Sequence, residues 1–371
     1  MRKMLCFLLI CVLLLPFDAA AAVPQVSAKA AVLLNAATGG VVLEYNGYAR
    51  LPMASTTKIM TALLLAEQPD LSKAIVTTAE MVTVEGSSMG LKVGDTVTLH
   101  DLLYGMLLAS GNDAANTTAI ALADSVEAFA ARMNEKAAAL GLRDTHFVTP
   151  SGLDDAAHYT TAYDLARLAM AAMENPVFAQ AAGAKSATLC YGNPPYDRTL
   201  TNHNKLLSLY EGCIGVKTGF TKKSGRCLVS AAQRDGVRLI AVTLNDPDDW
   251  SDHQNLLDYG FDAVQCLPVT PIIPQSVALI GGQQQNLPLA VQSTKLPLLR
   301  QEVAKLQQVV YIKKLVYAPV AAGEIIGRVE LYYGEKHLAD LHITAGQSVA
   351  QDLTCSVRRD WVYYIRLLLR L

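Results

Sequence analysis

Apolar runs and polar turns alternate along the chain with spacings that predict its elements. Near the start, apolar runs at 30–35 and 41–45 flank the turn residues 37–40, which predicts two strands joined by a turn. The apolar-rich stretches that follow are long enough for helices, and three later runs have the length of strands. The predicted helices span 55–67, 102–108, 114–122, 126–140 and 163–173, and the later strands span 213–217, 227–233 and 237–244.

Residues that start and end helices support this division. Gly141 can end the helix over 126–140 as its C-cap. Thr160 or Thr161 can cap the start of the helix over 163–173. The order of strands, then helices, then strands predicts a helical cluster packed on an antiparallel sheet, which is an α+β fold.

The pattern changes near Phe261. Pro268, Pro271 and Pro274 punctuate a stretch that we interpret as a linker. At 371 residues the chain is long for one domain, and the part that follows these prolines has short strand-like runs. We expect a first domain over 23–262 and a small β-rich domain over 263–353; the short runs are 277–280, 309–315, 325–333 and 338–343.

The N-terminus has the features of a signal peptide. Arg2 and Lys3 precede an apolar run over 5–15, and small residues at 19–22 suit cleavage. The run is too short to span a bilayer, which takes about 20 residues. We therefore predict that residues 1–22 are a signal peptide and that the mature chain is secreted across the cytoplasmic membrane; a retained N-terminal anchor is the alternative.

The C-terminus, residues 354–371, predicts an amphipathic helix. On a helix, Arg359, Tyr363, Arg366 and Arg370 share one face, and apolar residues cover the rest. Its last sixteen residues reach only about 24 Å, too little to span a bilayer. We expect this helix to lie in the lipid interface and hold the protein peripherally on the outer face of the membrane; docking on the protein's own core is the alternative.

Composition excludes some partners. The formal net charge of −2 provides no general basic field, so we expect no nucleic-acid partner. Five cysteines remain after the signal peptide, an odd number without metal-ligand spacing, so no metal and no cofactor is expected. The sequence leaves open whether one disulfide forms.

The first motif with chemical meaning is Ser55-Thr56-Thr57-Lys58. On a helix, Lys58 lies one turn after Ser55 and can reach its hydroxyl. Serine is a weak nucleophile until a base takes its proton, and lysine can be that base only when burial lowers its pKa. Apolar neighbours make such burial plausible, although a capped helix with a surface lysine has the same pattern.

Two further motifs follow in the chain. Ser110 and Asn112, at the break between two predicted helices, can aim a hydroxyl and an amide at one cavity. Lys217-Thr218-Gly219, at the end of an apolar strand, can bind a substrate carboxylate while the strand edge pairs with an extended peptide. Backbone N–H groups of Ser55 and Phe220 are candidates for an oxyanion hole. Each motif alone also fits a simple turn or helix break.

Together and in this order, the three motifs are typical of class A β-lactamases and penicillin-binding proteins. The chain resembles the low-molecular-mass penicillin-binding proteins, which are serine-type D-alanyl-D-alanine carboxypeptidases. The resemblance covers nearly the whole mature chain, and its markers include 52–62, 85–88, 102–105, 110–115, 150–153, 217–221, 249–253 and 257–261.

The resemblance implies a β-lactamase/transpeptidase-like catalytic domain and a set of residue roles. Ser55 is the acylated nucleophile, Lys58 its base, and Ser110 the third catalytic residue. Asn112, Lys217, Thr218, Gly219 and Phe220 bind the substrate. The implied reaction removes the terminal D-alanine from a peptidoglycan pentapeptide through an acyl-enzyme, and β-lactams acylate the same serine.

The sequence also departs from the family. Some relatives have His where this chain has Phe220, and some place an Arg near position 251, which has no clear counterpart here. His158 is interpreted as a structural residue. A class A-like β-lactamase is one alternative, but it would want a Glu-containing loop between the second and third motifs. A non-catalytic protein that binds penicillin or cell wall at the membrane surface is another.

Overall fold

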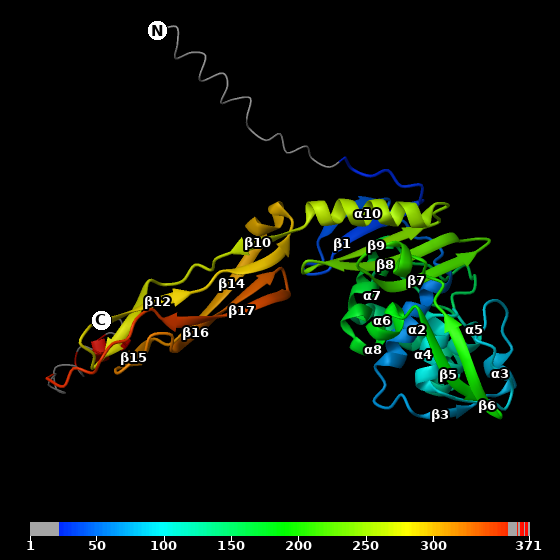
Figure 1. Ribbon diagram of the computed structural model, residues 1–371, viewed down its shortest axis with the longest axis horizontal. Helices are drawn as coiled ribbons and strands as arrows, with labels where there is room; N and C mark the ends of the chain where they lie inside the picture. Colours follow the sequence, from blue (N-terminus) through cyan, green and yellow to red (C-terminus); the bar gives the residue numbers. More distant parts are fainter. Residues whose placement is uncertain (1–21, 355–361, 363, 367, 370–371) are drawn as a thin grey trace, which may run out of the picture.

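The strands predicted on either side of the helical stretch meet in one antiparallel sheet. The computed structural model describes residues 22–354, 362, 364–366 and 368–369, and its five-stranded sheet has the order β2-β1-β9-β8-β7 (Figure 1). The N-terminal hairpin joins the three later strands where β1 pairs with β9. The strands are β1 (Ala30–Asn35), β2 (Val41–Tyr45), β7 (Cys213–Thr221), β8 (Gly225–Arg234) and β9 (Val237–Leu244).

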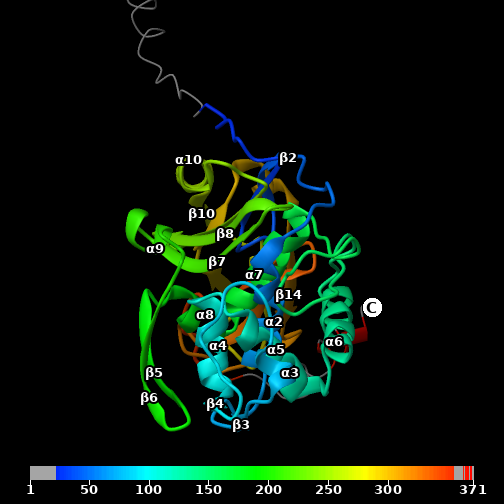
Figure 2. The same cartoon turned by 90° about the vertical axis from the view of Figure 1, so that its right-hand side faces the viewer.

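Helices cover both faces of this sheet (Figure 2). Successive residues of β1 point to opposite faces, so Val32 packs on the helical cluster while Leu33 packs toward α10 (Asp249–Ala263). The predicted α+β arrangement is therefore present. The helical cluster consists of η1 (Ala54–Thr57), α2 (Lys58–Ala66), α4 (Leu99–Leu107), α5 (Asn112–Ala123), α6 (Val126–Ala139), α7 (Ala162–Glu174) and α8 (Pro176–Gly183).

Two predicted helix boundaries coincide with observed caps. The Thr161 hydroxyl accepts a hydrogen bond from the Asp164 N–H at 3.0 Å and begins α7, so Thr161 is the cap and Thr160 is not. Gly141 follows the end of α6 with φ +68°, the left-handed conformation that glycine adopts most easily.

A smaller antiparallel sheet beside the helical cluster was not predicted. Its order is β3-β4-β5-β6, and the short helices α3 (Ala79–Val82) and α9 (Leu206–Leu209) lie in the adjoining segments. Strands of three residues show no period, and β6 is mostly exposed, so neither leaves an apolar pattern to recognise. In β5, however, Ala187, Leu189 and Tyr191 alternate with exposed residues, a strand pattern that was overlooked. The strands are β3 (Ala74–Val76), β4 (Thr96–Thr98), β5 (Ser186–Gly192) and β6 (Pro195–Thr201).

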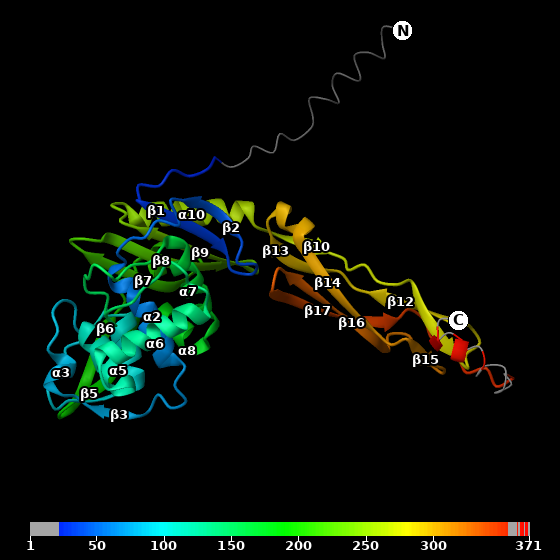
Figure 3. The ribbon, with the colours of Figure 1, turned by 180° about the vertical axis from the view of Figure 1, so that it is seen from behind.

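The C-terminal domain is built of β-strands, as expected (Figure 3). A six-stranded sheet has the order β14-β16-β17-β12-β11-β15, and β10 pairs with β13 in a separate ribbon. The strands are β10 (Gln265–Val269), β11 (Ser276–Ile280), β12 (Asn286–Val291), β13 (Thr294–Leu298), β14 (Leu306–Ile312), β15 (Leu315–Tyr317), β16 (Ile325–Tyr333) and β17 (Lys336–Ala345).

Three strand predictions need correction. Pro268 belongs to β10, opposite Lys295, and not to a linker; proline is tolerated there because each strand of a two-stranded ribbon is an edge. The predicted run 309–315 is divided between β14 and β15. Lys217, Thr218 and Gly219 lie inside β7, which continues to Thr221, and not at the strand's end.

The cysteines of the described residues are free thiols. Cys227 is buried, Cys213 and Cys266 are half-buried, and Cys190 is exposed. Cys355 lies outside the described residues.

Two side chains of the C-terminal domain form hydrogen bonds with the turn between β1 and β2. The buried Glu302 carboxylate, in η2 (Arg300–Lys305), accepts from Thr38 Oγ1 at 2.7 Å and from Asn35 Nδ2 at 3.3 Å. Lys336 Nζ donates to the Ala36 carbonyl at 2.7 Å. These bonds couple the two domains at this end of the catalytic sheet.

Both predicted terminal segments lie largely outside the described residues. The predicted signal peptide does so except for Ala22, and so do Arg359, Tyr363 and Arg370 of the predicted terminal helix. The described residues from 362 to 369 are helical, and the Tyr364 hydroxyl donates to the Leu279 carbonyl at 2.6 Å. No helix in the described part of the chain has the length and apolarity to cross a membrane.

Gly152 offers a test of close packing around η1. A Cβ at this position would overlap the Ala54 carbonyl oxygen, and φ is +87°. Gly94 has the same φ of +87°, but a Cβ there would have nothing within 4 Å. We expect Gly152→Ala to lower the free energy of unfolding by about 2–6 kcal/mol and Gly94→Ala by about 1–3 kcal/mol, because only the first adds a clash to backbone strain. Urea unfolding measures both, and equal losses would contradict the packing.

Candidate active site

Ser55 and Lys58 lie one turn apart at the start of the central helix. The chain enters η1 through Ala54, whose φ of +48° is a left-handed conformation that side chains rarely adopt. Ser55 is half-buried in this first turn, and α2 begins at Lys58. The Ser55 Oγ and Lys58 Nζ atoms are 2.9 Å apart, so the predicted hydrogen bond between them is present.

The amine of Lys58 is completely buried and has three polar neighbours. Besides Ser55, Nζ contacts Asn112 Oδ1 at 2.7 Å and the Ser151 carbonyl at 2.7 Å. Burial is the main cause that places the pKa of Lys58 well below its usual value, and the Lys217 charge adds to this. A neutral amine can donate to Asn112 and Ser151 and then has one lone pair, which points at the Ser55 hydroxyl.

Ser151 belongs to a segment for which the sequence predicted no role. The Thr61 hydroxyl donates to the Pro150 carbonyl at 2.6 Å, which ties this segment to α2. This position lets the Ser151 carbonyl accept the hydrogen bond from Lys58 Nζ. The signal was the family marker at 150–153, but no sequence pattern indicates that a backbone carbonyl binds the lysine.

His158 holds the same segment from the other side. Its Nε2 lies 2.7 Å from Thr57 Oγ1, and its Nδ1 accepts from the Val148 N–H at 2.9 Å. Burial lowers the pKa of His158 to about 4, so the ring is neutral at physiological pH. The contacts agree with a structural role.

Ser110 and Lys217 form a second contact across the site. Ser110, with φ +58°, lies in the break between α4 and α5, and its hydroxyl accepts from Lys217 Nζ at 3.1 Å. Lys217 also donates to the Thr218 carbonyl at 2.9 Å. Burial lowers the pKa of Lys217 to about 7, which makes this amine a readier proton donor than an ordinary lysine.

β7 forms the edge of the catalytic sheet and runs beside η1. A Cβ on Gly219 would lie 3.0 Å from Thr56 N and 3.1 Å from Ser55 N, so glycine permits this close approach. The outer side of β7 is without a strand partner in the described sheet. An extended peptide can therefore add along this edge, next to Ser55.

A cleft of about 320 Å³ opens over these residues. It is lined by the predicted Ser55, Ser110, Thr218, Gly219 and Phe220, whereas Lys58, Asn112 and Lys217 lie behind them. Phe220 is 65% exposed. The lining also includes residues to which the sequence assigned no function: Ser87, His203, Lys205, Arg226, Asp249 and Trp250.

Arg226 brings a permanent cation into the cleft. It lies on β8 opposite Phe220, and its Nη2 donates to Asp249 at 2.7 Å while the guanidinium lies over the Trp250 ring. The sequence offered no arginine near position 251. The fold provides one because the start of α10 packs beside β8.

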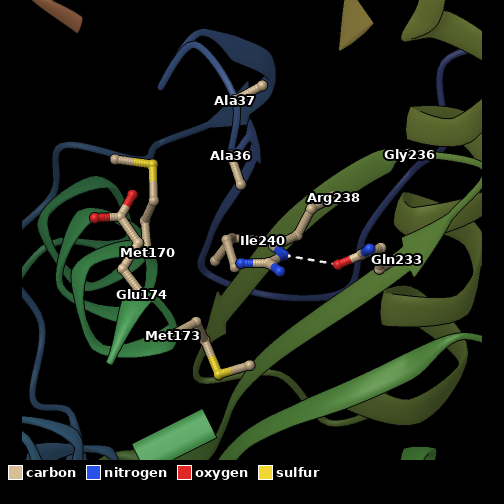
Figure 4. Close-up of a pocket in the computed structure, with 9 residues that line it drawn as sticks. All are labelled: Ala36, Ala37, Met170, Met173, Glu174, Gln233, Gly236, Arg238 and Ile240. Carbon is tan, nitrogen blue, oxygen red and sulfur yellow. Dashed lines mark hydrogen bonds between the residues drawn. The ribbon is translucent and has the colours of Figure 1, made fainter. Parts of the chain in front are cut away.

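A second cavity, of about 200 Å³, lies away from this site (Figure 4). It opens between α7 and the β8–β9 end of the sheet, near the turn that the C-terminal domain contacts. Arg238 and Gln233 are hydrogen-bonded to each other at 3.0 Å in its wall. The nine residues that line it include no serine or cysteine nucleophile.

Known protein families match both domains of the chain. The family model described as D-alanyl-D-alanine carboxypeptidase matches residues 18–248, and the model of the penicillin-binding protein 5 C-terminal domain matches 271–351. The D-alanyl-D-alanine carboxypeptidase DacF of Bacillus subtilis is 31% identical over 94% of this chain and 95% of its own length. DacB2 of Mycobacterium tuberculosis is 36% identical over 64% of this chain and 84% of its own length.

Solved structures support the fold of the catalytic domain. The Streptomyces K15 DD-transpeptidase has a TM-score of 0.62 at 34% identity and covers 64% of this chain and 98% of its own. A D-alanyl-D-alanine carboxypeptidase from Mycobacterium tuberculosis has a TM-score of 0.62 at 35% identity, over 66% of this chain and 95% of its own. The chain therefore belongs to the D-alanyl-D-alanine carboxypeptidase family, which confirms the resemblance, the fold and the carboxypeptidase function inferred from its sequence.

Proposed function

We propose that the chain removes the terminal D-alanine of peptidoglycan pentapeptides by acyl transfer through Ser55. The observation that carries this proposal is the 2.9 Å contact between the Ser55 hydroxyl and the fully buried amine of Lys58. A nucleophile with a neutral base one hydrogen bond away can attack a carbonyl without a third residue to relay its proton.

The first step forms the acyl-enzyme. Ser55 Oγ attacks the carbonyl of the penultimate D-alanine while its proton moves to Lys58 Nζ. The N–H groups of Ser55 and Phe220 stabilise the oxyanion. The C–N bond then breaks, and the leaving amine of the terminal D-alanine takes a proton from Ser110, which regains one from the Lys217 ammonium.

The second step releases the shortened peptide. Water attacks the ester carbonyl and gives a proton through Ser110 to Lys217, which the first step left neutral. As the ester C–O bond breaks, the Lys58 ammonium returns its proton to Ser55 Oγ, so both lysines regain their starting states. β-Lactams would acylate Ser55 in the same way as the peptide, because their strained amide occupies the place of the D-Ala–D-Ala bond.

We assign the substrate's terminal carboxylate to Thr218 and Arg226. Lys217 carries its positive charge behind the cleft wall, where it is bonded to Ser110 and to the Thr218 carbonyl. Arg226 reaches the cleft itself, and its guanidinium remains charged at all physiological pH values. Lys217 then contributes long-range attraction and proton transfer, and Arg226 with the Thr218 hydroxyl makes the direct contacts.

Covalent labelling with fluorescent penicillin tests the nucleophile. We expect label on the wild type and none on Ser55→Ala, because the alanine has no oxygen to acylate. Ser87→Ala is the matched control, since Ser87 lines the same cleft and should remain dispensable for labelling. Label that survives Ser55→Ala would refute the assignment, and label that is lost within seconds would favour a β-lactamase.

Substrate pairs that differ only in the terminal group test Arg226. We expect Arg226→Gln to lower kcat/KM for a D-Ala–D-Ala carboxylate by about 10- to 100-fold, the usual loss for a hydrogen bond to a charged group. The same peptide as its terminal carboxamide should lose far less. Lys223→Gln removes an exposed charge from the adjacent β7–β8 turn and serves as control. Equal losses for both substrates would contradict a carboxylate contact.

We propose that the C-terminal helix holds the enzyme on the outer face of the cytoplasmic membrane. In support, Val362, Ile365, Leu368 and Leu369 are 46–62% exposed, whereas Tyr364 packs on the C-terminal domain. Exposed apolar side chains next to Arg366 suit a surface of anionic lipid. The signal peptide proposed for residues 1–22 would bring the chain to that side.

Sedimentation with anionic phospholipid vesicles tests the anchor. We expect the mature chain to pellet with the vesicles and a chain truncated after 355 to stay in solution with normal penicillin labelling. Tyr364→Phe, which removes the bond to Leu279 but no apolar area, should pellet like the full chain. Vesicle binding that persists after truncation would refute the anchor.

A further inference from the structure

We propose that Asp113 is a positioning residue for the catalytic base, acting through the loop 85–91 and the Asn112 amide. The inference rests on the proposed role of Lys58. Asp113 follows directly after Asn112 in the first turn of α5, yet it is turned away from the cleft and is 1% exposed.

The Asp113 carboxylate is surrounded by hydrogen-bond donors of one loop. The Ser88 hydroxyl donates to it at 2.5 Å, and the backbone N–H groups of Met89, Gly90 and Leu91 donate at 2.9, 3.1 and 3.0 Å. Four donors from four consecutive residues fold the loop around a single charged group. Bonds from N–H groups to an ionised carboxylate are among the stronger ones in proteins.

The same loop fixes the direction of the Asn112 side chain. Asn112 N donates to the Ser87 carbonyl at 2.7 Å, and Asn112 Nδ2 donates to the Glu85 carbonyl at 2.7 Å. With its NH₂ group bound to the loop, the amide must present Oδ1 to Lys58, where the distance is 2.7 Å. The opposite orientation would place NH₂ against the amine hydrogens and take away one of the three neighbours of Lys58.

The loop is also held from its outer side by the β5–β6 hairpin. The Tyr191 hydroxyl donates to the Met89 carbonyl at 2.7 Å, and Arg198 Nη1 donates to the Gly90 carbonyl at 2.6 Å. The hairpin therefore binds carbonyls of the loop while Asp113 binds its N–H groups. This accounts for the unpredicted small sheet, which braces a segment of the active site.

Asp113 also acts on Lys58 by its charge. It opposes the lowering of the Lys58 pKa, which burial and the Lys217 charge produce. The charged groups facing Lys58 are thus Asp113 from α5 and Lys217 from β7, and the neutral His158 ring lies beyond Thr57. Without the Asp113 charge the pKa of Lys58 falls further.

The pH dependence of acylation by penicillin in Asp113→Asn tests both effects. Because Lys58 must be neutral to take the proton, the rate falls as pH drops through its pKa. We expect the acidic limb of Asp113→Asn to move to lower pH and its plateau rate to fall by about 10- to 100-fold, as misplaced catalytic groups do. Asp101→Asn is the matched control, since Asp101 is a buried carboxylate of the α4 capping box without a contact to the loop.

Two further variants keep the charge and loosen only the geometry. Gly86→Ala places a Cβ 2.7 Å from Asn112 Nδ2 and strains a backbone whose φ is +91°, and Ser88→Ala removes one donor to Asp113. Both variants should lower the plateau rate of acylation, and Gly86→Ala should lower it more. The acidic limb of the pH profile should stay where it is in the wild type. They also serve if Asp113→Asn does not fold.

Specific outcomes decide the inference. A plateau rate and acidic limb in Asp113→Asn equal to those of Asp101→Asn would overturn it, and so would normal rates in both Gly86→Ala and Ser88→Ala. Failure of the proposed function itself is distinguishable, because it would appear as label surviving in Ser55→Ala.

Discussion

The site depends on one constraint, which is that the amine of Lys58 must stay buried and neutral beside Ser55. An ammonium excluded from water is strongly disfavoured, so burial itself converts a poor base into one that works near neutral pH. Burial alone would leave the amine hydrogens unsatisfied. The Asn112 amide oxygen and the Ser151 carbonyl accept them and thereby direct the remaining lone pair at the serine hydroxyl.

Meeting this constraint requires segments far apart in the chain to approach closely. Ser151, Asn112 and Lys58 belong to three different segments, and the absence of a side chain at Gly152 and Gly219 allows the backbones to touch η1. Ala54 and Ser110 have φ values of +48° and +58° immediately beside the reactive groups. Such conformations cost about 1–3 kcal/mol each, and packing in the helical cluster offsets that cost.

The sequence predicted the reactive side chains better than the residues that hold or surround them. Ser55, Lys58, Ser110, Asn112 and Lys217 could be predicted because side-chain chemistry leaves short motifs on strongly apolar elements. Ser151 acts through its carbonyl, and any residue provides a carbonyl, so the family marker at 150–153 did not indicate its role. Arg226 became a neighbour of Asp249 only through the packing of α10 on β8, a contact that no local pattern contains. In the small sheet, β3 and β4 are too short to show a period, and β6 is mostly exposed.

The coupling between domains gives the C-terminal domain a purpose consistent with the proposed anchor. The catalytic domain and the described part of the terminal helix lie at opposite ends of an elongated molecule (Figure 1). A flexible linker would let the catalytic domain tumble toward the lipid surface. Glu302, however, is buried against Thr38, and Lys336 binds the Ala36 carbonyl. These contacts restrain the orientation of the C-terminal domain relative to the catalytic domain. If the terminal helix binds lipid as proposed, this arrangement would place the cleft away from the membrane surface, on the side of the cell wall.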